Sequence, residues 1–262
     1  MPCVPLQSAH PPASSLWSGT ALFAVLAALS CGSALANPVW IGRFAGSDGT
    51  PPDPWRVVQF STGVPPTRYR TRTWDGIGAI EAQAHGSTAL LARSVEVNLL
   101  ETPVLCWRWR IDAPVRNADM ARPEAHDFAA RLYVAFKLPA ETMTWATRLK
   151  LATARTLFGD QLPDAALNYV WDNRYPEGTR RPHIDTDRIT MVVLRSGAKH
   201  AGTWVSERRN VLEDLRQALG AKDARLAMVA LATDSDNTGE EIRAGYADLH
   251  FVAADRACLF PP

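Results

Sequence analysis

The chain has 262 residues, of which 47% are hydrophobic and 21% charged, and its formal net charge is +1. This composition is typical of a globular protein that is long enough to form one sizeable core. A net charge near zero argues against a nucleic-acid partner, which normally requires a basic excess.

The N-terminal segment differs in composition from the rest of the chain. Residues 1–36 contain no Asp, Glu, Lys or Arg, and residues 20–30 form an apolar run with the length of a signal-peptide core. A small-x-small motif ends at Ala36, so we interpret residues 1–36 as a signal peptide that is cleaved after Ala36. Cys31 raises a lipoprotein alternative, although the residues before it fit a lipobox poorly. The mature chain, 37–262, is expected to be periplasmic or secreted and has no second apolar segment of membrane-spanning length.

Cleavage would remove two of the four cysteines and leave Cys106 and Cys258. These two could form a disulfide in an oxidising compartment, but the sequence does not show whether they lie close together. A metal site built from cysteines is excluded, because two isolated cysteines do not provide the C-x-x-C spacing.

The mature chain contains no linker, repeat or low-complexity tract and is therefore predicted to be a single domain. Alternating strand-like segments at 67–74 and 77–87 are joined by Asp75-Gly76, a strong hairpin signal. Further strands are predicted at 90–99, 103–112, 129–138, 187–196, 202–209, 224–233 and 244–253. Such spacing predicts an all-β-dominated fold, namely an antiparallel β-sandwich of jelly-roll type.

Two segments have helical patterns. Residues 210–220 begin with Asn210 as an N-cap, carry Glu213 three residues later and end at Gly220, which is the usual residue after a helix. Residues 141–159 are longer and less regular. Both are expected to be helical insertions that cover an end of the sandwich.

Two central segments each have an apolar and a polar face. In 103–112 the apolar residues alternate with Arg108 and Arg110, and we expect Trp107 and Trp109 to lie in the core. In 126–136, the residues opposite the apolar face include Asp127, Arg131 and Tyr133.

The polar residues of these segments suggest a binding surface made of Arg108, Arg110, Asp127, Arg131 and Tyr133. Arg and Asp can each form two hydrogen bonds to adjacent hydroxyl groups, and Tyr can stack on a sugar ring. We therefore interpret the chain as a binding module for a polar small molecule, such as a carbohydrate or a cell-envelope glycan. The alternative is a solvated face on which Arg and Asp pair across strands, each pair contributing about 0.2–1 kcal/mol.

The segment 230–239, ALATDSDNTG, places acidic residues directly after an apolar run. Its Asp, Asn and Gly residues predict a turn, in which side chains bond to nearby amides and Gly239 takes a positive φ. An EF-hand is excluded because the twelfth position is Gly245 instead of Glu. The alternatives are a looser structural Ca²⁺ site at Asp234, Asp236 and Asn237, and a pair of catalytic acids. No motif indicates any other cofactor.

An enzymatic alternative comes from the segment EVNLLE, which contains Glu96 and Glu101. Retaining glycosidases need two carboxyl groups about 5–5.5 Å apart, and these two Glu residues would need a bulge to share a strand face. His126 with Asp127 is a second candidate pair. A glycan-active hydrolase or lyase is thus the alternative to a binding module, and a structural or protein-interaction role is a third hypothesis.

Several segments, in this order, resemble the landmarks of the DUF3047 family, a bacterial domain family of unassigned function. The segments are TRYRTRTWDGIGAIEAQAHG, PVLCWRWRI, HDFAARLYVAF, LNYVWDNRYPEGT, WVSERRNVLEDLRQALG and ATDSDNTGEEIRAGYADLHF. The resemblance spans about residues 40–252 and implies an exported, β-rich domain. His126 departs from the family pattern, which tends to have paired aspartates before Phe. The matching residues are Trp107, Trp109, Asp127, Arg131, Trp171, Glu207, Arg209, Asn210, Asp214, Asp234, Asp236, Asn237 and Thr238.

Overall fold

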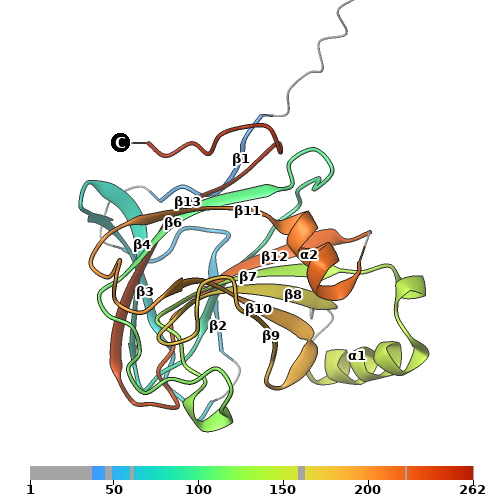
Figure 1. Ribbon diagram of the computed structural model, residues 1–262, viewed down its shortest axis with the longest axis horizontal. Coiled ribbons are helices and arrows are strands. Elements are labelled where there is room, and N and C mark those ends of the chain that lie inside the picture. The colour runs from blue at the N-terminus through green and yellow to red at the C-terminus, as the bar shows by residue number, and fades with distance from the viewer. Residues whose placement is uncertain (1–36, 45–48, 60–61, 159–162, 222, 262) are drawn as a thin grey trace, which may run out of the picture. The chain divides into compact units, whose positions relative to one another are not determined.

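A computed structural model describes residues 37–44, 49–59, 62–158, 163–221 and 223–261. The predicted signal peptide, 1–36, lies outside the described residues. The described residues form the strands β1 (Val39–Gly42), β2 (Arg56–Val58), β3 (Arg68–Trp74), β4 (Ile77–His85), β5 (Leu90–Ser94), β6 (Val104–Ile111), β7 (Ala130–Lys137), β8 (Ala165–Asp172), β9 (Arg180–His183), β10 (Thr186–Ser196), β11 (Val205–Asn210), β12 (Arg225–Ala232) and β13 (Glu241–Val252). The α-helices are α1 (Trp145–Phe158) and α2 (Val211–Leu219), with short 3₁₀ helices at Pro123–Ala125 and Ala140–Thr142. Figure 1 shows their arrangement.

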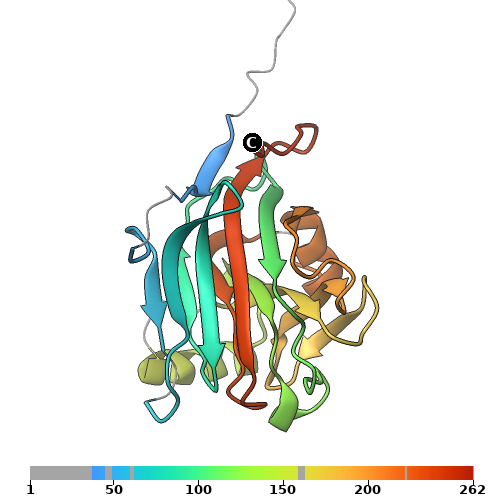
Figure 2. The same cartoon turned by 90° about the vertical axis from the view of Figure 1, so that its left-hand side faces the viewer.

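The first sheet, sheet A, has the strand order β11-β6-β13-β4-β3, and β1 pairs with β13. All its pairings are antiparallel. In Figure 2 its strands face the viewer, with β13 running between β4 and β6. The predicted hairpin between β3 and β4 is confirmed, because Asp75 and Gly76 both have positive φ, at 53° and 79°.

The second sheet, sheet B, has the order β2-β5-β12-β7-β8-β10-β9. Its neighbours are antiparallel with one exception, since β8 and β10 run parallel. The predicted β-sandwich is therefore confirmed, but it is not purely antiparallel. The exception arises because β9 forms a hairpin with β10 at the edge of the sheet and leaves β10 to pair with β8.

The space between the sheets is filled by the apolar faces of both. Trp107 and Trp109 of β6 are fully buried, as predicted, and they meet Tyr169 and Trp171 of β8. The Trp107 and Tyr169 rings are stacked with centroids 5.5 Å apart, and those of Trp109 and Trp171 are 5.7 Å apart. A single hydrophobic cluster includes residues of both sheets, so the alternation of β6 and β7 gives the core as expected.

Helix α2 begins and ends where its capping residues predict. The Asn210 side chain accepts a hydrogen bond from the Glu213 amide at 3.0 Å, and Gly220 ends the helix with φ 63°. The helix contacts β6, β8, β10 and β11, so it covers one end of the space between the sheets. Helix α1 begins four residues later than the predicted segment 141–159. Neither helix in the described part of the chain has the length and apolar character needed to cross a membrane.

Four strands were not predicted as such: β1, β2, β8 and β9. Strand β8 is the informative case, because all eight of its residues are buried. A strand covered on both faces has no alternation of polar and apolar residues, so its sequence gives no period-two signal. Strand β5 also ends at Ser94, before the predicted end at residue 99.

Cys106 of β6 and Cys258, whose pairing the sequence left open, form a disulfide with Cα atoms 5.8 Å apart. Two further contacts hold the C-terminal segment against sheet A. The Leu259 amide donates to His250 Nε2 at 2.8 Å, and Arg108 donates to the Pro261 carbonyl at 3.0 Å. The disulfide therefore joins the C-terminal segment to a central part of the sheet.

Candidate functional site

The residues predicted to share one binding surface lie on two different faces. Strand β6, with Arg108 and Arg110, belongs to sheet A, whereas β7, with Arg131 and Tyr133, belongs to sheet B. Both strands turn their apolar residues toward the common core, so their polar residues point outward in opposite directions. The prediction of one shared face is wrong, because alternation separates the two sides of a strand but does not assign the strand to a sheet.

The two arginines of β6 take part in ion pairs within the protein. Arg108 pairs with Asp248, and the side chains are only 13% and 8% exposed. Arg110 pairs with Asp75, and its guanidinium lies 4.1 Å from the centre of the Trp74 ring. Both guanidinium groups therefore serve to hold the outer face of sheet A together.

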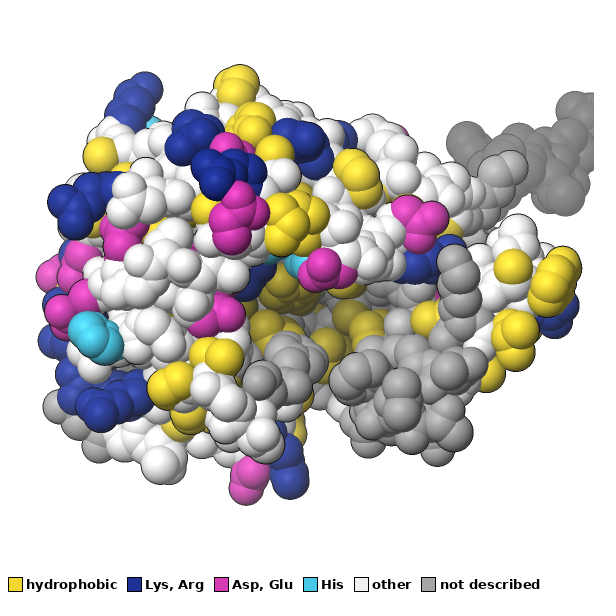
Figure 3. Space-filling model, turned by 90° about the horizontal axis from the view of Figure 1, so that it is seen from below, with side chains coloured by type: hydrophobic (Ala, Val, Ile, Leu, Met, Phe, Trp, Pro, Cys, Tyr) yellow, Lys and Arg dark blue, Asp and Glu magenta, His cyan; other side chains and the backbone are white. Residues whose placement is uncertain are grey.

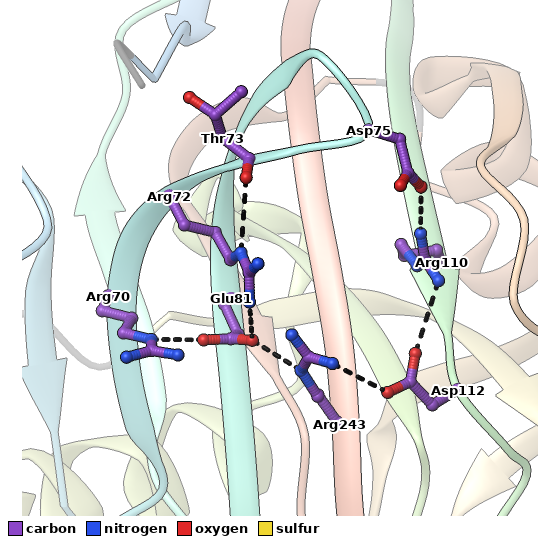
Figure 4. A network of polar contacts seen from close by, with 8 residues as sticks. All are labelled: Arg70, Arg72, Thr73, Asp75, Glu81, Arg110, Asp112 and Arg243. Atoms are coloured by element: carbon purple, nitrogen blue, oxygen red, sulfur yellow. Dashed lines mark hydrogen bonds and ion pairs between the residues drawn. The ribbon is translucent and has the colours of Figure 1, made fainter. Parts of the chain in front are cut away.

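A larger ion-pair network surrounds Glu81 on the same face (Figure 4). The Glu81 carboxylate is fully buried and accepts hydrogen bonds from Arg70, Arg72 at 2.8 Å and Arg243 at 2.5 Å. Although burial opposes ionisation, these three arginines hold the pKa of Glu81 below its ordinary value. Arg243 also donates a hydrogen bond to Asp112, at 3.3 Å, and so extends the network. This face of the protein is thus organised by internal pairing of carboxylates with guanidinium groups.

On sheet B, two distant parts of the sequence meet in one buried cluster. Arg131 pairs with Asp234, with side chains only 8% and 2% exposed. Asp127 accepts hydrogen bonds from the Asn237 side chain at 3.0 Å and from the Thr238 amide at 2.7 Å, across 110 residues of sequence or more. Carboxylate oxygens of Asp127, Asp234 and Asp236 lie within 4.8 Å of one another. We call these three residues and Arg131 the carboxylate cluster.

The segment that contributes Asp234 and Asp236 to the carboxylate cluster is the predicted turn. The turn occupies residues 236–238, and the Gly239 amide, at φ 71°, donates to the Ser235 carbonyl at 2.7 Å. Asn237, which the sequence suggested as a metal ligand, instead donates its side-chain amide to Asp127. The turn prediction is confirmed, and Asn237 has the role of positioning Asp127.

The environment of the cluster favours protonation of its carboxylates. Burial, together with the charges of Asp127 and Asp236, raises the pKa of Asp234 to about 7, against the effect of Arg131. Burial and the charge of Asp127 also raise the pKa of Asp236. Both shifts follow from the same cause, since three carboxyl groups share one guanidinium in a largely buried place.

Two histidines lie beside the cluster, with ring centroids 4.6 Å apart. Burial and the nearby charge of Arg131 lower the pKa of His126 to about 3 and that of His183 to about 4. Both imidazoles are therefore neutral at pH 7. His126 is only 7% exposed, which leaves it little access to a substrate in this conformation.

Acid is expected to destabilise the fold through these histidines. In the unfolded chain they bind protons near pH 6.5, but in the fold they stay neutral down to about pH 3–4, so the stability that they contribute above pH 6.5 is lost as the pH falls. Asp234 acts in the opposite sense, because its raised pKa gives stability that is lost as the pH rises through about 7. Between pH 6.5 and 4.5 the two histidines contribute more to this dependence than Asp234 does, and the raised pKa of Asp236 reduces the net slope.

This dependence can be measured as the free energy of unfolding, obtained from urea denaturation, against pH. His126→Gln should flatten the slope by up to about 1.4 kcal/mol per pH unit, whereas His85→Gln, an exposed residue of sheet A, should leave it unchanged. Equal slopes in the wild type and in His126→Gln would contradict the expectation.

The outer face of sheet B also carries an open pocket of about 530 Å³ between α1 and the strands β8 and β10. Seen from this side, the molecule is hollowed, with hydrophobic side chains inside and charged side chains at the edge (Figure 3). The polar residues that line the pocket include Asp164, Asp185, Asp187 and Arg188, and Arg188 Nη2 is buried with no hydrogen-bond partner among the residues that the structure describes. These four were not among the predicted binding residues.

Tyr133 lies on the same face as this pocket. It is half-buried, and its neighbour two residues along the strand, Ala135, pairs with Ala166, which lines the pocket. The Tyr133 ring centre lies 5.6 Å from the Arg131 guanidinium, so the carboxylate cluster borders the ring. Of the five predicted binding residues, Tyr133 alone is both on this face and accessible, because Asp127 and Arg131 are buried.

The residues of the enzymatic alternative do not form one site. Glu96 and Glu101 are exposed and lie in the segment that follows β5, where Glu101, in the turn 99–101, accepts a hydrogen bond from Asn98 at 2.9 Å. Glu96 lines a second pocket of about 960 Å³, and that lining includes none of Glu101, His126 and Asp127. The expected strand is absent here, because β5 ends at Ser94. The geometry therefore gives no support to catalysis by these four residues.

Other residues that match the family landmarks have structural contacts. Asp214 accepts hydrogen bonds from Tyr169, Arg180 and Arg209, which joins α2 to both sheets. Glu207 accepts from Arg195 and from the Trp109 ring at 3.0 Å. These groups stabilise the closed end of the sandwich.

Comparison with protein families gives one match, to the family described as "Protein of unknown function (DUF3047)", over residues 53–250. The chain belongs to the DUF3047 family. Within the family match lie both segments of the carboxylate cluster, 127–131 and 234–238. No curated protein matches the sequence.

This DUF3047 chain is similar to several solved β-structures at low identity. One is the family 11 carbohydrate-binding module of a Clostridium thermocellum cellulase, with 7% identity, a TM-score of 0.39 and coverage of 83% of this chain and 95% of that chain. Another is a family 30 carbohydrate-binding module from the same organism, with 10% identity, a TM-score of 0.35 and coverage of 84% and 95%. The xyloglucanase domain of NopAA from Sinorhizobium fredii has 6% identity, a TM-score of 0.37 and coverage of 76% and 96%. Likeness at this level carries no argument about function.

Proposed function

We propose that this DUF3047 chain is an exported binding module that takes a polar glycan in the hollow on the outer face of sheet B. The observation that carries the proposal is the buried, unpartnered Nη2 of Arg188 in a pocket that also holds Asp164, Asp185 and Asp187. A donor without a partner in a buried place is destabilising unless a ligand or water satisfies it. Hydroxyl groups of a sugar would accept from Arg188 and donate to the aspartates.

Tyr133 lies on the same sheet face, outside the lining of the pocket, and would supply the complementary apolar contact to a glycan that extends beyond the pocket. Its ring is half-buried beside the fixed guanidinium of Arg131, so it loses little conformational freedom when a ligand binds. Aromatic rings of this kind offer a large flat surface and a polar tip. A pocket of about 530 Å³ is also within the usual range for small-molecule sites.

The roles of the predicted binding residues change accordingly. Asp127 and Arg131 are 1% and 7% exposed, so they position Tyr133 and the turn 236–238 instead of contacting the glycan directly. Arg108 and Arg110 face the other side of the sandwich and have no part in this site.

Export of the chain is part of the proposal. The disulfide between Cys106 and Cys258 supports it, because structural disulfides form and persist in oxidising compartments such as the periplasm. Detection of the chain in a periplasmic or secreted fraction, with its N-terminus at residue 37, would test this part.

The binding proposal is tested by affinity electrophoresis of the purified protein in gels that contain individual neutral or acidic polysaccharides. Retardation is expected with at least one polysaccharide, and Tyr133→Ala and Arg188→Ala should each weaken binding about tenfold or more, which corresponds to about 1.4 kcal/mol. Arg68→Ala is the control, because this exposed side chain on sheet A forms no hydrogen bond or ion pair with other described residues. Equal retardation of all three variants and the wild type would refute the assignment of the hollow.

A further inference from the structure

The carboxylate cluster contains more negative than positive charge. Asp127, Asp234 and Asp236 contribute three carboxylates when ionised, and Arg131 contributes one guanidinium, which leaves two negative charges. Such an excess is costly in a place where Asp127 and Asp234 are each 1% exposed.

One carboxylate oxygen in this cluster is a buried acceptor that lacks a donor among the described residues. Asp234 Oδ2 pairs with Arg131, but Asp234 Oδ1 is buried and has no hydrogen-bond partner among the described residues. A buried acceptor left without a donor costs about 1–3 kcal/mol, and more when it is charged. Asp127 also retains lone pairs, because its two oxygens accept hydrogen bonds from only Asn237 and Thr238.

We propose that Asp127, Asp234 and Asp236 bind one divalent cation of the Ca²⁺ type. Their oxygens lie within 4.8 Å of one another, and a single ion at the usual Ca²⁺–oxygen distance of about 2.3–2.6 Å from each would fit that spacing. The two positive charges of the ion would balance the two negative charges that Arg131 leaves uncompensated. Exposed Asp236 gives the ion a route from solvent. The ligand set differs from the one suggested by the sequence, because Asp127 replaces Asn237.

The site is independent of glycan binding, so the two proposals can fail separately. The experiment is differential scanning calorimetry of the purified protein without glycan, first in EDTA and then in 10 mM CaCl₂. Sites in extracellular modules have Kd values of about 10⁻⁴–10⁻³ M, and this concentration should raise the Tm by about 3–10 °C. Titration calorimetry of the EDTA-treated protein should give one Ca²⁺ per chain.

Two variants at exposed aspartates separate a specific site from general charge effects. Asp236→Asn removes an exposed ligand with little risk to the fold and should abolish the Ca²⁺ response. Asp185→Asn removes a carboxylate that is 81% exposed and weakly paired with His183, and it should keep the full response. The proposal is overturned if Ca²⁺ does not raise the Tm of the wild type, or if it raises the Tm of both variants equally.

Discussion

Replacing Arg131 with methionine is expected to lower the free energy of unfolding by about 3–5 kcal/mol in the presence of EDTA. The substitution leaves Asp234 buried without the cation that it pairs with, next to the carboxylates of Asp127 and Asp236. It also removes the guanidinium that lies 4.9 Å from the Phe128 ring centre. The loss would be measured by urea denaturation at pH 8, above the raised pKa of Asp234, which is about 7.

Two further variants test whether the unpaired charge of Asp234 causes the loss of stability in Arg131→Met. Arg68→Met, at an exposed position of sheet A, should change stability by no more than about 0.5 kcal/mol. The double variant Arg131→Met/Asp234→Asn should recover part of the loss, because it no longer buries an unpaired charge at residue 234. A loss of less than about 1 kcal/mol in Arg131→Met would mean that the pair contributes little to the fold.

Local signals in the sequence were sufficient for several elements. Helix α2 was predicted from Asn210, Glu213 and Gly220, which act on neighbouring backbone groups and need no tertiary information. The hairpin at Asp75-Gly76 is local in the same sense, because its two residues adopt the positive φ that this turn requires. Alternation likewise identified the buried side of β6 and β7 correctly.

The candidate site depends on information that such patterns do not contain. Strands β6 and β7 are consecutive in the predicted order, yet they belong to opposite sheets, so one predicted polar surface becomes two. Alternation also marked Asp127 and Arg131 as outward-facing, but the turn 236–238 folds over them and buries them. Contacts between residues 127 and 237 cannot be deduced from spacing within either segment.

The pocket residues were missed for a related reason. Asp185 and Arg188 lie in and next to a hairpin turn at the sheet edge, and they line a pocket only because α1 packs opposite them. Helix α1 comes from a separate insertion in the sequence. A buried polar atom without a hydrogen-bond partner in the described part of the chain, such as Arg188 Nη2 or Asp234 Oδ1, can be recognised only in the folded chain and not in the sequence.

Removal of the disulfide is also expected to lower the free energy of unfolding strongly. Cys106 and Cys258 are separated by 152 residues, so the bond closes a loop that includes five of the seven strands of sheet B and three of the six strands of sheet A. In the chain-entropy view, a link across so long a loop restricts the unfolded chain strongly, and its removal costs about 2–5 kcal/mol. The double variant Cys106→Ala/Cys258→Ala should show this loss in urea denaturation, without a free thiol to complicate refolding.

The disulfide's contribution can be separated from that of the side chains around it. Wild-type protein unfolded and refolded in reductant should lose a similar amount of stability, since it keeps both sulfur atoms but lacks the bond. The C-terminal segment has other anchors, because Arg208 donates to the Ala254 carbonyl at 2.6 Å and Leu259 bonds to His250. These contacts are non-covalent, however, and are lost on unfolding, so they cannot restrict the unfolded chain and should not compensate for the missing link. A loss below about 1 kcal/mol in both measurements would show that the bond has little effect on stability.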